Sequence, residues 1–69
     1  MSATEKAKIK GMLECVEETN PPAFLELQEK ARRPEYKFSD PVVSNTLKVF
    51  ELLDENENIN PTVIEIMKV

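Results

Sequence analysis

Apolar residues recur at helical spacing in four stretches of the chain, and short polar segments separate these stretches. The pattern predicts helices over about residues 4–18, 21–33, 41–54 and 61–68. The chain contains one glycine, so few positions tolerate a positive φ angle, and tight β-hairpins are not expected. The sequence therefore predicts a small all-α domain with four helices.

The starts of these helices are marked by a recurring pair in which asparagine or aspartate precedes proline. The pairs are Asn20-Pro21, Asp40-Pro41 and Asn60-Pro61. Asparagine and aspartate are favoured N-cap residues, and proline is favoured at the first helical position because its missing N–H would have no partner there. Ser2 and Glu5 fit a capping box for the first helix, and Pro34 is expected to end the second.

The apolar faces of the four predicted helices supply the expected core. The third helix has the broadest face, and it comprises Val42, Val43, Leu47, Val49, Phe50 and Leu53. The fourth is short and must dock on the rest of the chain or on a partner, because isolated short helices are marginal. The core candidates are Ile9, Met12, Val16, Phe24, Leu27, Val43, Leu47, Phe50, Val63 and Met67.

The two halves of the chain resemble each other. The first contains IKGMLECVEETNPPAFLELQ and the second contains LKVFELLDENENINPTVIEIMK, and each has a helix, an acidic turn, Asn-Pro and a helix. This pattern predicts two helical hairpins in one domain, residues 1–69. Either a duplication or a similar composition of two short hairpins accounts for the likeness.

The length, charge distribution and apolar content of the chain limit the classes of partner that it can bind. The chain has 69 residues, enough for one domain with a thin core. Acidic and basic residues balance up to Lys37, so the net charge of −4 arises entirely from residues 38–69. Phosphate binding needs a net basic surface, so nucleic acid is not the expected main partner. No apolar run is long enough to span a membrane.

The side chains that usually carry catalysis are scarce. Histidine is absent, no glycine-rich phosphate loop occurs, and the only cysteine, Cys15, is predicted on a buried helix face. We therefore expect neither enzyme activity nor a cofactor. A single cysteine and the lack of a signal-peptide pattern predict an intracellular, cytoplasmic protein.

Residues 54–65 resemble the calcium-binding loop of an EF-hand. Asp54, Asn56 and Asn58 occupy the first, third and fifth loop positions, where oxygen ligands are expected. Glu65 occupies the twelfth position, where EF-hands place a bidentate glutamate. The resemblance implies a degenerate calcium-binding protein with these four residues as ligands.

Two residues depart from the EF-hand pattern. Ile59 stands where the family has a glycine at a sharp turn, and Pro61 stands where it has an aliphatic residue. A polar turn followed by an Asn-Pro helix start explains the same residues. We therefore expect no metal, and calcium binding is the alternative hypothesis.

Protein binding is the function that the sequence favours. Leu25 and Leu52 lie off the main apolar faces of their predicted helices, and Tyr36 lies in the connection between the second and third helices. Together these three residues would form a docking patch. The sequence thus predicts a non-catalytic adaptor or regulatory subunit that docks on another protein or on a copy of itself.

Overall fold

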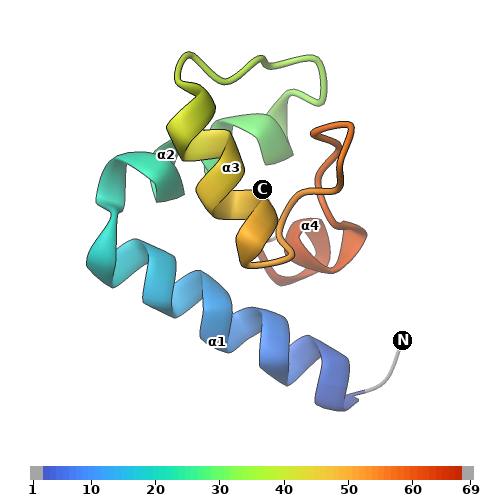
Figure 1. Ribbon diagram of the computed structural model, residues 1–69. Coiled ribbons are helices and arrows are strands. Elements are labelled where there is room, and N and C mark those ends of the chain that lie inside the picture. The colour runs from blue at the N-terminus through green and yellow to red at the C-terminus, as the bar shows by residue number, and fades with distance from the viewer. Residues whose placement is uncertain (1–2, 68–69) are drawn as a thin grey trace.

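The computed structural model describes residues 3–67 and contains four α-helices (Figure 1). They are α1 (Ala3–Thr19), α2 (Pro21–Arg32), α3 (Pro41–Val49) and α4 (Pro61–Met67). Within the described part of the chain, the only β-type pairing is an isolated antiparallel bridge between Leu53 and Ile59. The predicted all-α class is confirmed. None of the four helices is both long and apolar enough to cross a bilayer.

The helix starts agree with the Asn/Asp-Pro pairs. The side chain of Asn20 accepts a hydrogen bond from the backbone N–H of Ala23 at 3.3 Å, and that of Asp40 accepts one from Val42 at 2.9 Å. Asn60 Oδ1 accepts from the backbone N–H of Thr62 at 2.9 Å. Each cap thus satisfies an N–H that has no partner inside its helix. The Ser2 end of the predicted capping box, and residue 68 of the predicted fourth helix, lie outside the described residues.

The end of the third helix differs from the prediction: α3 ends at Val49 and does not continue to residue 54. Glu51 has a φ of 63°, in the left-handed region. The N–H of Glu51 donates to the carbonyl of Lys48 at 3.0 Å, and the N–H of Leu52 donates to that of Leu47 at 2.9 Å. These two bonds form a Schellman motif, which closes a helix at a left-handed residue.

Replacing Glu51 with glycine is expected to raise the free energy of unfolding by about 0.5–1 kcal/mol, because glycine has no Cβ to strain a left-handed backbone. Urea unfolding followed by circular dichroism measures the change. The ion pair between Lys8 and Glu51, 3.2 Å long and exposed on both sides, is lost in this variant. Glu51→Ala removes the same pair without relieving the backbone, so it serves as the control. A glycine variant no more stable than the alanine variant would contradict the expectation.

After the Schellman motif the chain turns inward and then back. Leu52 and Leu53 are both buried, although they are adjacent in sequence. The carbonyl of Leu52 accepts from the N–H of Asn60 at 3.0 Å, and Leu53 bridges Ile59. The segment between α3 and α4 is therefore an ordered loop that contributes two leucines to the core.

The helices pack around α1 and α2. These two contact each other, as the first predicted hairpin requires, and α4 packs against both of them. The predicted pairing into two hairpins is not confirmed, because α4 docks on α1 and α2, whereas α2 is the helix that α3 contacts. The buried apolar residues are Ile9, Leu13, Val16, Ala23, Leu27, Leu47, Leu52, Leu53 and Val63.

All ten predicted core residues belong to this packed cluster. Five are fully buried, and the others are partly buried and pack against them: Met12, Phe24, Val43, Phe50 and Met67. The predicted core omits four apolar residues that the structure buries: Leu13, Ala23, Leu52 and Leu53.

Candidate functional site

The predicted docking patch does not form. Leu52 has an exposed fraction of 0% and lies in the core, because the left-handed Glu51 ends α3 and directs the following residue inward. The prediction for Leu52 assumed a continuous helix and was wrong. Leu25 lies on the surface of α2 with 63% of its area exposed, and Tyr36 is half-buried in the connection after α2.

Tyr36 takes part in a network that fastens this connection to α2. Its hydroxyl donates to Glu26 Oε1 at 2.9 Å, and the backbone N–H and hydroxyl of Ser39 donate to the same oxygen, each at 3.3 Å. Lys30 Nζ donates to the carbonyls of Pro34 at 2.6 Å and of Tyr36 at 2.9 Å. Residues 33–39 are therefore tied down by two side chains of α2.

The ring of Tyr36 is also held in place. It meets Phe38 edge-on at a centroid distance of 5.7 Å, and the Arg33 guanidinium lies 5.8 Å from its centroid. The hydrogen bond to Glu26 raises the pKa of the Tyr36 hydroxyl above its ordinary value of 10.0. These contacts show that Tyr36 stabilises the connection between α2 and α3.

The most exposed large apolar side chains of the described residues lie on α3. Val42 is 68% exposed and Val49 is 79% exposed. They are seven residues apart, so they lie on the same side of the helix two turns from each other. Asn45, also exposed, lies between them on that side. We call this surface the outer face of α3, defined by Val42, Asn45 and Val49.

The outer face of α3 corrects the predicted apolar stripe, which included Val42 and Val49. At about 100° per residue, Val49 lies roughly 200° around the helix from Leu47, which is fully buried. Val42 is similarly displaced from Leu47. The spacing of these two valines from Leu47 is visible in the sequence, and it places both of them on the side of the helix that faces away from the core.

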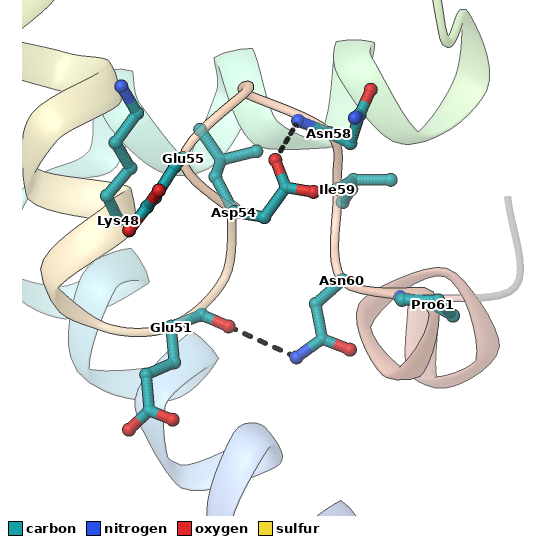
Figure 2. A pocket seen from close by; sticks show the side chains of 9 residues that line it. Lys48, Glu51, Asp54, Glu55, Asn58, Ile59, Asn60 and Pro61 are labelled. Carbon is teal, nitrogen blue, oxygen red and sulfur yellow. Dashed lines mark hydrogen bonds between the residues drawn. The ribbon is translucent and has the colours of Figure 1, made fainter.

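The segment that resembles an EF-hand loop is folded in another way. Asp54 Oδ1 accepts hydrogen bonds from the backbone N–H groups of Asn56 at 2.8 Å and of Asn58 at 2.9 Å. Figure 2 shows the bond from Asn58. Glu57 has a φ of 64°, and its N–H donates to the carbonyl of Asp54 at 3.0 Å. The carboxylate therefore closes a tight turn of its own loop.

The remaining predicted calcium ligand is directed elsewhere. Glu65 lies on α4 and accepts a hydrogen bond from Lys6 Nζ of α1 at 3.4 Å. Among residues 3–67, no group of three or more His, Cys, Asp or Glu side chains is arranged to hold a metal ion. The geometry of this segment therefore offers no support for the calcium alternative.

Acid is expected to weaken the loop at Asp54. The backbone N–H of Asn58, aided by that of Asn56, holds the pKa of Asp54 below its ordinary value of 3.8. A lowered folded-state pKa means that the carboxylate adds stability above about pH 4, and this contribution is lost as the pH falls through the folded-state pKa. A carbon-13 NMR titration of the carboxyl carbons measures the pKa of Asp54 in the folded protein. A midpoint for Asp54 at or above its ordinary value of 3.8 would contradict the expectation.

A pocket of about 400 Å³ opens where the loop after α3 meets the start of α4 (Figure 2). Its apolar lining comes from Leu53, Ile59 and Pro61. The charged residues around it are Lys48, Glu51, Asp54 and Glu55. The Glu51 carbonyl accepts from Asn60 Nδ2 at 3.1 Å, which joins the two walls. The pocket thus combines an apolar lining with a mostly acidic rim.

Cys15 is exposed and not disulfide-bonded, so its predicted burial was wrong. It lies two residues after Leu13 and one before Val16, and both of these are buried. The neighbours of α1 cover the stripe of Ile9, Leu13 and Val16, and Cys15 lies beside this stripe.

Comparisons of the chain with protein-family models, with curated proteins and with solved structures found no match.

Proposed function

We propose that this protein is a non-catalytic protein-binding module and that it docks through the outer face of α3. The observation that carries the proposal is the exposure of Val42 and Val49, at 68% and 79%, on one side of a nine-residue helix. A single exposed apolar residue is ordinary in a soluble domain, whereas two aligned on one side of a short helix, with Asn45 between them, give that side two apolar contact points.

The position of α3 supports the proposal. Of the other helices, α3 contacts α2 (Figure 1). A helix packed on one side leaves its opposite side available to a partner. A strip of two valines flanking a polar residue fits an amphipathic helix of a partner protein, whose apolar side would cover the valines while its polar residues meet Asn45.

Two further parts of the proposal rest on chemistry. The chain has no histidine, the side chain that most often serves as a general acid or base near neutral pH, and this supports a binding role over catalysis. The free, exposed thiol of Cys15 suits a reducing compartment, which supports an intracellular location.

Leu25, exposed on α2, is a candidate for the edge of the interface centred on the outer face of α3.

Replacing Val49 with aspartate is expected to weaken partner binding at least about tenfold while changing the free energy of unfolding by no more than about 0.5 kcal/mol. A charge placed at the centre of an apolar contact is desolvated without a counter-ion, whereas on the free surface it stays hydrated. A photoreactive amino acid at position 49 first identifies the partner by cross-linking. The purified partner is then titrated with each variant by calorimetry.

The matched control is Ala7→Asp, which makes the same kind of change at an exposed position on α1. Partner binding equal for Val49→Asp and for the unchanged protein would overturn the proposal. The partner found by cross-linking can also be a second copy of the chain. In that case light scattering detects a dimer that Val49→Asp dissociates. A strictly monomeric protein without a cross-linked partner would also count against the proposal.

A further inference from the structure

We propose that the pocket between the end of α3 and the start of α4 receives a lysine side chain of the partner protein. The inference deepens the proposed function and rests on it, because it concerns the same class of partner. It assigns a second contact beside the outer face of α3, on the loop that follows this helix.

The lining matches the two chemical parts of a lysine side chain. Leu53, Ile59 and Pro61 present apolar surface, which suits the four-carbon stem. The rim carries three carboxylates against one ammonium group, so the pocket attracts a cation. A side chain with an apolar stem and a charged tip satisfies both features at once.

Ion pairs decide which rim charges remain uncompensated. Glu51 is paired with Lys8 at 3.2 Å, and Lys48 is paired at 3.6 Å with Glu57, which is not part of the lining. Among residues 3–67, Asp54 and Glu55 form no ion pair of this kind, although the charge of Lys48 lies near enough to Asp54 to help lower its pKa. Lys8 and Lys48 together offset two of the four carboxylates of Glu51, Asp54, Glu55 and Glu57, so the mouth of the pocket keeps a net negative charge.

Asp54 is held in place before any ligand arrives. Its Oδ1 accepts from two backbone N–H groups at 2.8 and 2.9 Å, and this turn fixes the position of the carboxylate. The bond from Asn58 is drawn in Figure 2. The Leu53–Ile59 bridge and the bond from Asn60 Nδ2 to the Glu51 carbonyl hold the two walls. A preorganised site loses less conformational entropy when it binds a ligand.

The test uses two small probes and does not need the partner. Nα-acetyl-lysine methylamide is titrated into the nitrogen-15-labelled protein at neutral pH and low salt, and amide shifts are followed by NMR. The second probe, Nα-acetyl-norleucine methylamide, keeps the four-carbon stem and lacks the ammonium group. We expect saturable shifts at residues 53–60 with the lysine probe, and binding at least threefold weaker with the norleucine probe.

Two variants sharpen the test. Glu55→Gln removes one uncompensated charge from an exposed side chain and is expected to weaken lysine binding several-fold. Glu14→Gln makes the same change on the exposed surface of α1 and is expected to leave binding unchanged. The proposal is overturned by an absence of saturable shifts at residues 53–60, by equal binding of the two probes, or by equal effects of the two variants. Each of these results leaves the Val49→Asp test of the outer face of α3 standing on its own.

Discussion

Leu52→Ala is expected to lower the free energy of unfolding by about 2–5 kcal/mol. Leu52 is fully buried, and together with Leu53 it joins the loop after α3 to the core. Truncation removes favourable burial and leaves a cavity that the surrounding backbone fills only in part. A domain of this size has a total stability of roughly 3–10 kcal/mol, so the variant is expected to lose a large fraction of its stability.

Thermal and urea unfolding by circular dichroism measure the Leu52→Ala effect. Leu25→Ala is the matched control, because it makes the same truncation at a leucine that is 63% exposed, and its expected effect is within about 0.5 kcal/mol. This comparison also distinguishes the observed end of α3 from a helix that continues to residue 54. In the longer helix Leu52 would be exposed, and the two leucine variants would unfold alike.

Lys30→Met is expected to lower the free energy of unfolding by about 1–3 kcal/mol. The side chain is only 9% exposed, and its ammonium group donates to the carbonyls of Pro34 and Tyr36. Methionine keeps most of the apolar stem but removes the donor, so both carbonyls lose a charge-assisted hydrogen bond. The connection between α2 and α3 is expected to loosen as a result.

Urea unfolding measures the stability of Lys30→Met, and fluorescence reports on the connection itself. The chain has one tyrosine and no tryptophan, so the emission and anisotropy of Tyr36 report directly on residues 33–39. Lys37→Met, which removes an exposed ammonium group from the same connection, is the control. Equal stability of the two methionine variants would show that the two carbonyl contacts of Lys30 contribute nothing.

The helix starts were predictable because their cause is local. An Asn or Asp side chain caps the helix that begins at the next residue, and proline at that residue has the backbone angle the helix needs. Asn20, Asp40 and Asn60 all act in this way. Neighbours in sequence supply every group involved, so no knowledge of the tertiary fold is required.

The end of α3 was not predictable by the same means. A helix that ends at a left-handed residue is usually marked by glycine, and here the residue is Glu51. Its conformation is held by hydrogen bonds and by the burial of Leu47 and Leu52 on either side of the turn. Glu57 likewise adopts a positive φ without glycine. The end of α3 is therefore determined by tertiary packing, which the local sequence does not reveal.

The candidate site was only partly predictable for related reasons. The predicted exposure of Leu25 is correct, because the helical periodicity of an intact helix determines which side chains face the solvent. Leu52 was misplaced because helical periodicity stops before it. The pocket brings together residues from both sides of a turn, and no spacing rule for a single helix describes that arrangement.

The packing of α4 on α1 has a consequence for the order of events during synthesis. Because α4 covers one side of α1, that side stays open to water in a nascent chain that has emerged only as far as residue 60. The chain therefore reaches its folded state after α4 has emerged. The contact between α4 and α1 closes a long loop, and closing this loop costs conformational entropy. A ribosome-bound intermediate of this kind would be a substrate for chaperones that recognise exposed apolar helix surfaces.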